Sequence, residues 1–223
     1  MRDSYKRFFK HFNIEFNQVI QFGIHEDTIF PKNKILRKVW NEHIYKVLHN
    51  EVAYIRGYGR DAHGTELYIE LFELLLGNQN IKKDPTNNSQ PRKVLENVTG
   101  YYKSGKNKQC IQNYQVSHIF GKTKNPFLFV APWNIVWKPK ILDPFTGHES
   151  KGEYSELYQR EFQKKARELY KDFIEEYNIL VEKYFSNIKI DLALSKMEKI
   201  HHENKLFNRF ASDARKELTK IVI

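Results

Sequence analysis

The 223-residue sequence predicts an α+β fold in which a mostly helical chain encloses one β-hairpin. Apolar and aromatic residues recur at helix-like intervals over residues 1–55, and again over a long stretch that begins at Glu153. Between residues 109 and 142, by contrast, β-branched and aromatic residues form strand-like runs. Because a chain of this length can bury a sizeable apolar core, we expect one compact unit.

Residues 1–92 are expected to form an N-terminal helical region. The segments KRFFKHFNIEFNQVIQF and ILRKVWNEHIYKVLHNEVAYI have helical spacing, and Pro31 and Asn33 separate them. Thr65 and Gly77 are the expected N-cap and C-cap of the next helix, TELYIELFELLL. The composition of NQNIKKDPTNNSQPRK predicts a polar linker after it.

Residues 93–185 are expected to hold the hairpin and a long helix. The segments QCIQNYQV and FLFVAPWNIVW are predicted strands, and a turn rich in Gly, Lys, Asn and Pro joins them. The helical pattern begins at Glu153 and continues for about 30 residues. A C-terminal helical tail is expected over residues 186–223.

Several classes of protein are disfavoured by the sequence. No run approaches the roughly 20 apolar residues that a membrane-spanning helix requires, and the N-terminus MRDSYKRFFKHFN is charged where a signal peptide is apolar. We therefore expect a cytoplasmic protein without a membrane partner. A single cysteine, Cys110, excludes both an internal disulfide and a CxxC zinc motif.

The charge distribution indicates a polyanionic partner. The net charge is +10, and no Asp or Glu occurs from Asn97 through Leu142. Aromatic residues are interleaved with lysines in this acid-free window, a combination typical of nucleic-acid surfaces, although a solvated face beside an ordinary core is the alternative. The lysines expected to contact nucleic acid are Lys103, Lys106, Lys108, Lys122, Lys124, Lys138 and Lys140.

Two arginines near the glycine-bearing loop before residue 65 are also expected to contact nucleic acid. The segment GRDAHGT imitates the spacing of a P-loop but lacks its lysine, and no βαβ pattern follows, so a nucleotide site is disfavoured. Arg56 and Arg60 are instead expected to contact a phosphate backbone close to a helix start.

The segment YQVSHIFGKTKNPFLFVAPWNI places His118 after one predicted strand and Asn134 after an apolar run, sixteen residues later. With the long helix that follows, this order resembles the HNH, or ββα-metal, nuclease family over roughly Gln109 to Glu156. The resemblance implies a ββα-metal hairpin-helix motif, with His118 as the general base and Asn134 as the residue that fixes the histidine-bearing loop. Histidine suits the role of base because its ordinary pKa lies near neutrality.

The same resemblance implies one divalent metal ion, with Mg²⁺ or Mn²⁺ expected. Asp143 offers a hard oxygen ligand and His148 a nitrogen ligand, and the two compete for the role of main ligand. Ser117, a weaker ligand, stands where many members of the family carry Asp, Glu or His before the base. The turn chemistry of DPFTG is the structural alternative for Asp143.

These features together predict a metal-dependent DNA endonuclease that hydrolyses phosphodiester bonds. The size of the chain resembles that of sequence-specific type II restriction enzymes in the same family, so double-stranded DNA is the expected substrate and a homodimer a possible assembly. Two alternatives remain open, namely a noncatalytic nucleic-acid-binding module that uses the same basic face and a nonspecific nuclease or toxin.

Overall fold

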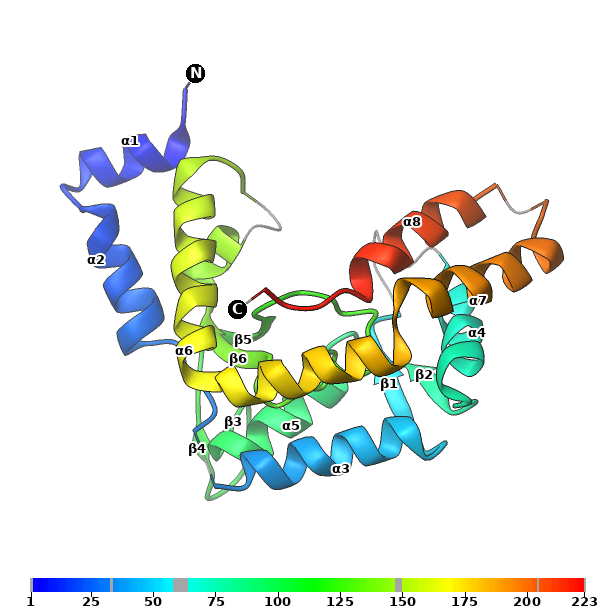
Figure 1. The fold of residues 1–223 in the computed structure, drawn as a ribbon. Helices are drawn as coiled ribbons and strands as arrows, with labels where there is room; N and C mark the ends of the chain where they lie inside the picture. Colours follow the sequence, from blue (N-terminus) through cyan, green and yellow to red (C-terminus); the bar gives the residue numbers. More distant parts are fainter. Residues whose placement is uncertain (1, 33, 58–63, 147–149, 204, 223) are drawn as a thin grey trace.

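The structure, a computed structural model, describes residues 2–32, 34–57, 64–146, 150–203 and 205–222. Within these residues the chain is a mixed α and β protein in which helices dominate (Figure 1). The helices are α1 (Ser4–His11), α2 (Phe16–Ile20), α3 (Leu36–Leu48), α4 (Thr65–Leu76), α5 (Ser89–Thr99), α6 (Glu153–Tyr184), α7 (Asn187–Ile200) and α8 (Phe207–Glu217), with the π-helix η1 (Gln21–Glu26) and the 3-10 helix η2 (Lys140–Thr146). The strands are β1 (Ala53–Ile55), β2 (Ile81–Lys83), β3 (Tyr101–Tyr102), β4 (Gln109–Cys110), β5 (Tyr114–His118) and β6 (Ile135–Pro139).

The strands of the described residues pair in twos. β1 pairs with β2 and β3 with β4, both in parallel, whereas β5 and β6 are antiparallel with His118 opposite Ile135 and Ser117 opposite Val136. Because side chains alternate across a strand, one face of this pair carries Trp137 and Ile135, which pack against Leu95 of α5. The other face carries Ser117 and Lys138.

The long helix α6 organises the centre of the molecule. Its buried side chains recur every three or four residues, the period of one helix face, and they are Tyr158, Phe162, Ala166, Tyr170, Ile174, Tyr177 and Val181. The helix bends at Tyr170, where φ is −127° and ψ is 23°, and the bend is visible in Figure 1. The predicted long helix from Glu153 is thus confirmed, and the main core around it includes residues from Phe9 to Ile221.

The second predicted strand was placed too early in the sequence. Phe127 and Leu128 have no exposed surface, but they lie in turns, with the amides of Leu128 and Phe129 both donating to the carbonyl of Asn125. Pro126 and Pro132 lack the N–H that a strand ladder requires. The segment is therefore a buried loop, and the strand begins only at Ile135.

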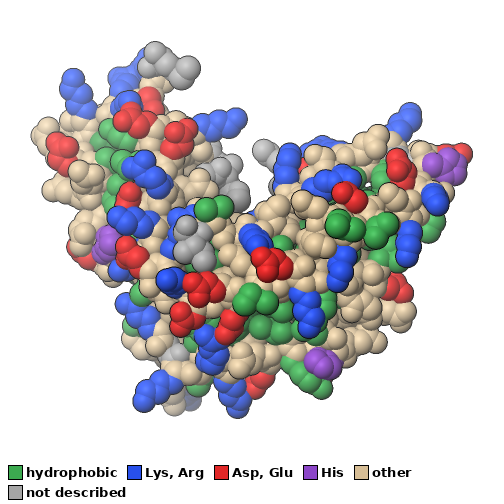
Figure 2. Space-filling model, viewed as in Figure 1, with side chains coloured by type: hydrophobic (Ala, Val, Ile, Leu, Met, Phe, Trp, Pro, Cys, Tyr) green, Lys and Arg blue, Asp and Glu red, His purple; other side chains and the backbone are tan. Residues whose placement is uncertain are grey.

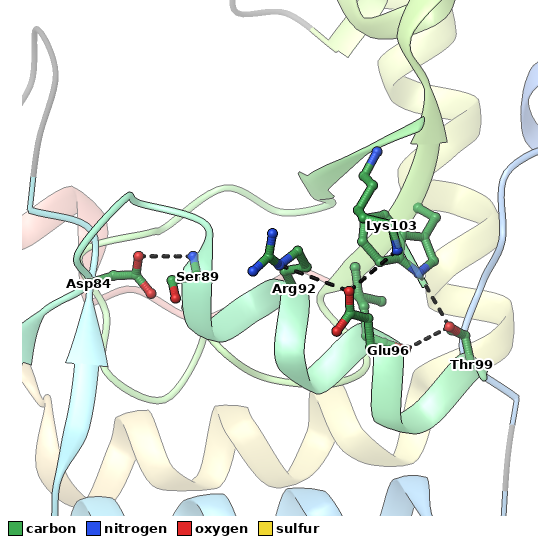
Figure 3. A network of polar contacts seen from close by, with 8 residues as sticks. Asp84, Ser89, Arg92, Glu96, Thr99 and Lys103 are labelled. Carbon is green, nitrogen blue, oxygen red and sulfur yellow. Dashed lines mark hydrogen bonds and ion pairs between the residues drawn. The ribbon is translucent and has the colours of Figure 1, made fainter. Parts of the chain in front are cut away.

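The predicted linker over residues 78–93 is wrong, because this stretch contains β2 and the start of α5. Asp84 is fully buried, and its carboxylate accepts hydrogen bonds from the backbone amides of Thr86, Ser89 and Gln90 at 2.9, 3.0 and 2.7 Å. Figure 3 shows the contact with Ser89. The carboxylate of Asp84 thereby satisfies two amides at the start of α5 and one in the turn before it. The linker prediction failed because the polar composition of this segment was taken to mean that its side chains are exposed.

The glycine caps of α4 differ in part from expectation. Gly77 is the C-cap with a φ of +67°, as predicted. At the other end Gly64, with a φ of +71°, is the N-cap, and Thr65 is the first helical residue, one position from its predicted role. None of the helices in the described part of the chain is long and apolar enough to cross a membrane.

Candidate active site

His118 is the last residue of β5, and its ring is held on two sides. The ring stacks on Phe129 with centroids 5.4 Å apart and planes 12° from parallel, and Nε2 lies 2.8 Å from the carbonyl oxygen of Phe129. Because a carbonyl only accepts, Nε2 is the nitrogen that donates. In the neutral ring the lone pair is then on Nδ1.

Asn134, directly before β6, ties together the loop that follows His118. Its side chain is fully buried, and Oδ1 accepts from the amide of Phe120 at 3.0 Å. Nδ2 donates to the carbonyl of Leu128 at 3.1 Å and to that of Gly121 at 3.4 Å. The side chain of Asn134 therefore joins the start of the loop after His118 to the buried turns that hold Phe129.

A cleft of about 1130 Å³ opens beside His118. Ser117 and Asp143 line it together with His118, from β5 and η2, while the opposite wall comes from α8. Figure 2 shows the surface hollowed between the lobe that carries α8 and the lobe that carries the N-terminal half of α6. Two of the three predicted metal ligands thus share a cleft with the predicted base.

The metal ligands are only partly placed. Ser117 is nearly buried, Asp143 is half-buried in η2, and His148 lies outside the described residues. Within the part of the chain that the structure describes, no three His, Cys, Asp or Glu side chains gather into a metal-binding group. The described donors are therefore one carboxylate and one hydroxyl.

Lys138 differs most from its predicted role. It has no exposed surface, and its ammonium lies over the rings of Tyr158 and Phe162 at 4.1 and 4.3 Å. Burial lowers the pKa of Lys138 to about 7, and the nearby charge of Asp143 acts in the opposite direction. A side chain beneath α6 is not available to a phosphate on the surface, so Lys138 is a core residue here.

Lys122 and Lys124 also make internal contacts. Nζ of Lys122 donates to the carbonyl of Lys216 at 2.7 Å and to Thr219, and its partial burial lowers its pKa. Lys124 is buried, and its Nζ donates to the hydroxyl of Thr65 at 3.0 Å. Both lysines line the cleft, but they also fasten the loop after His118 to neighbouring elements.

The other predicted basic residues form a separate surface around β3 and β4. Lys106, Lys108 and Lys140 are exposed, and Lys103 is half-buried. Lys108 lies over the ring of Tyr102 at 4.0 Å. In Figure 3 the backbone of Lys103 contacts Glu96 of α5, which anchors this surface to the helix.

The two predicted arginines have different outcomes. Arg56 lines the cleft, so it lies with His118 on the side of the candidate site. Arg60 is outside the described residues.

Reasoning from the sequence did not reveal the part that α8 plays in the cleft. Arg209, Asp213, Lys216 and Glu217 all line it, although each lies about 90 to 100 residues beyond His118. Their spacing fits one helix face, but spacing alone does not reveal which element that face meets. Burial raises the pKa of Glu217, and the backbone amide of Lys124, which donates to the carboxylate, acts in the opposite direction.

Comparison with known proteins places the chain in a family. It belongs to the family described as "Uncharacterised protein PM1201", which matches residues 31–223 and thus covers the cleft and both of its walls. The chain is 42% identical over 225 residues to "Uncharacterized protein PM1201" of Pasteurella multocida (strain Pm70), with 99% of this chain and 97% of that protein covered. No solved structure matches the chain.

Proposed function

We propose that the protein is a metal-dependent DNA endonuclease whose site is of the ββα-metal type, with β5, β6 and α6 as the two strands and the helix. The observation that carries the proposal is the arrangement of His118 and Asn134 at the two ends of the loop between β5 and β6. One histidine ends a strand at a cleft, its ring is fixed through Nε2, and a buried asparagine fastens the loop around it. Asn134 also satisfies backbone groups of the fold, so the support for catalysis comes from the position of the fixed His118 ring at the cleft.

The chemistry assigned to His118 follows from its ring orientation. With Nε2 donating to Phe129, Nδ1 would accept a proton from water as the water oxygen forms a bond to the phosphorus of a phosphodiester. The bond from phosphorus to the leaving oxygen breaks, and that oxygen takes a proton from solvent water. The imidazolium that forms is held in place by the same carbonyl, which accepts a hydrogen bond from either form of the ring. Positioned base catalysis of this kind contributes about 10² to 10⁴ in rate.

Asp143 and Ser117 are the described residues that would hold the metal ion. Both residues line the cleft with His118, and the oxygen donors of their side chains suit a hard ion such as Mg²⁺, which commonly keeps several waters and takes few protein ligands. A divalent ion there supplies charge neutralisation at the phosphate and at the leaving oxygen. His148 is the further ligand that the resemblance to the family suggests.

The basic lining of the cleft supports a polyanionic substrate. Among the described residues, five basic side chains line the cleft, compared with three acidic ones: Arg56, Lys122, Lys124, Arg209 and Lys216 against Asp143, Asp213 and Glu217. A positive potential in a cleft concentrates nucleic acid near the site. Restriction-type cleavage of double-stranded DNA by a homodimer remains part of the proposal, as does an expected cytoplasmic location.

A noncatalytic nucleic-acid-binding module is the second candidate. The exposed lysines Lys106, Lys108 and Lys140, which do not line the cleft beside His118, favour it. It keeps the basic cleft and surface but requires no base at His118 and no metal. The two candidates therefore differ in what happens to bound DNA.

The deciding experiment is cleavage of supercoiled plasmid by the purified protein with Mg²⁺, with Mn²⁺ and with EDTA. We expect discrete metal-dependent bands, and a smear would indicate a nonspecific nuclease. His118→Ala should retain DNA binding but lose at least 100-fold in cleavage rate. His49→Ala, at an exposed histidine of another part of the surface, is the matched control and should cut normally.

The result that overturns the proposal is also specific. Binding without cleavage under every metal condition would favour the binding module, and normal cleavage by His118→Ala would refute the assignment of the base. Asp143→Ala tests the metal in the same assay, because loss of a ligand should raise the Mg²⁺ concentration required for half-maximal cleavage.

A further inference from the structure

The polar face of α8 is a feature of the cleft that the chemistry above does not use. Arg209, Asp213 and Lys216 recur every three or four residues along α8, and all line the cleft together with Glu217 and the buried Phe210. Phe207, Ala211 and Ala214, on the other side of the helix, are buried. Thus α8 presents one polar face across the cleft from His118, while its apolar face holds it on the protein.

Two contacts fasten this helix to the loop that follows His118. The Glu217 carboxylate accepts a hydrogen bond from the backbone amide of Lys124, and Nζ of Lys122 donates to the carbonyl of Lys216. Asn125 adds a contact from its side chain to the carbonyl of Glu217 at 3.5 Å. The end of α8 and the loop of the candidate base therefore form one connected unit.

From these observations we infer that α8 is the helix that reads the base sequence of double-stranded DNA in the major groove, with Arg209 and Asp213 as the base-contacting residues. The inference rests on the proposed function, since it assigns the sequence preference of the same cleft. An exposed helix face fits the wide major groove of B-form DNA, whereas the deep, narrow major groove of double-stranded RNA does not admit it.

The residue types on this face suit base recognition. Arginine donates two hydrogen bonds to the O6 and N7 atoms of guanine, and aspartate accepts from the amino group of cytosine. Arg209 and Asp213 lie 3.8 Å apart as an exposed ion pair, with 61% and 53% of their side chains accessible. An exposed ion pair contributes little free energy in water. Both side chains can therefore give up their mutual contact and bind base edges instead.

The contacts between the end of α8 and the loop after His118 have a consequence for the position of cleavage. Because the loop after His118 is bonded to the end of α8, a base pair bound by Arg209 would lie at a fixed distance from the scissile phosphate. Lys216, near that end, is assigned to a phosphate instead of a base, because its charge suits phosphate and carries no sequence information.

The test uses the full-length protein and a library of DNA duplexes with randomised positions. A His118→Ala variant selects bound duplexes without cutting, and the active protein is scored by sequencing the ends that it produces. Arg209→Ala is expected to lose the preference at one or two positions, by about tenfold or more per base pair. Lys216→Ala is expected to weaken binding to all sequences alike.

Arg215→Ala is the matched control. Arg215 lies on α8 as well, with 51% of its side chain exposed, but it pairs with Asp191 of α7 and does not line the cleft. Removal of this arginine should leave the selected sequence unchanged. Since both arginines are exposed, thermal melting of the two variants should match that of the unmodified protein.

The outcomes separate this inference from the proposed function. Sequence selection by His118→Ala that changes with Arg209→Ala supports the inference, even if the active protein cuts nothing. Cleavage with no sequence preference would overturn it and leave an endonuclease without a reading helix. A preference that survives Arg209→Ala and Asp213→Ala would also overturn it, because another element would then read the DNA.

Discussion

Replacement of Lys138 by Met should stabilise the protein in a pH-dependent way. The ammonium group is fully buried and has no hydrogen-bond partner among the described residues, while its pKa is lowered by burial from 10.5 to about 7. Each pKa unit corresponds to about 1.4 kcal/mol, so keeping the charge in the folded state at neutral pH costs up to about 5 kcal/mol.

The direction of the pH dependence follows from proton binding. The folded pKa of Lys138 lies below its unfolded value, so between pH 7 and 10.5 the unfolded chain holds a proton that the folded protein has released. The free energy of unfolding of the unmodified protein therefore rises with pH in this window, and the cost is fully present below pH 7. Because Met has no charge and similar volume, the variant lacks this pH dependence.

Two rings reduce the size of the expected gain. Tyr158 and Phe162 lie 4.1 and 4.3 Å from the ammonium, and desolvated cation–π contacts contribute about 2 kcal/mol each. We expect Lys138→Met to raise the free energy of unfolding by about 1 to 3 kcal/mol at pH 6.5. The gain should decrease, by up to about 3 kcal/mol, as the pH rises to 9.5.

Urea unfolding of both proteins at pH 6.5, 8 and 9.5 measures the difference directly. Lys38→Met, at an exposed lysine of α3, is the control and should show no such trend. A difference between Lys138→Met and the unmodified protein that stays constant across the three pH values would refute the reasoning, because Lys138 would then titrate at its ordinary value in the folded state.

Three further predictions concern other polar contacts. Asn134→Ala should lower the free energy of unfolding by about 2 to 4 kcal/mol in urea, since it leaves the amide of Phe120 and the carbonyl of Leu128 without their partner; an unchanged midpoint would contradict this. Asp84→Ala should cost a similar amount because three backbone amides lose their acceptor, and a loss below about 0.5 kcal/mol would mean that water replaces it. Replacement of Lys106 and Lys108 together by Ala should reduce the slope of log affinity for DNA against log salt by about two, and an identical slope would place the DNA elsewhere.

Local patterns predicted only some of the regular elements, and Ala53–Ile55, which was predicted as the end of a helical segment, is the strand β1. The period of the apolar residues predicted α6 from its first residue, and Gly77 predicted the end of α4, because both signals depend on neighbours along the chain. The strand before His118 was predicted only in part, because the predicted segment QCIQNYQV is divided between β4 and β5, and β5 extends to His118. The linker prediction failed because it rested on composition, as the buried Asp84 shows, and the second strand was misplaced because its apolar run is a buried loop before Asn134.

Only one wall of the cleft could be predicted from the sequence. Its histidine-bearing wall comes from residues that are close in sequence, so a motif can describe it. Its other wall, α8, is brought there by packing against α7 and α4, through residues such as Phe207 and Phe210, whose burial no local pattern discloses. The burial of Lys138 has the same origin, since it depends on the later helix α6 and not on the neighbours of the lysine in sequence.

Stability alone explains why some polar side chains are buried in this protein, but it does not explain all of them. Asp84 and Asn134 satisfy backbone groups that would otherwise lack partners, so each contributes to the fold where it stands. Lys138 satisfies none among the described residues, and an apolar residue would fill the same space at lower cost. It lies on the strand that follows Asn134, and its amine is close enough to Asp143 for the carboxylate to affect its pKa. The variant Lys138→Met tests whether the amine serves the site that Asp143 lines. If this variant is more stable than the unmodified protein but slower in metal-dependent cleavage, the buried amine contributes to activity at a cost in stability.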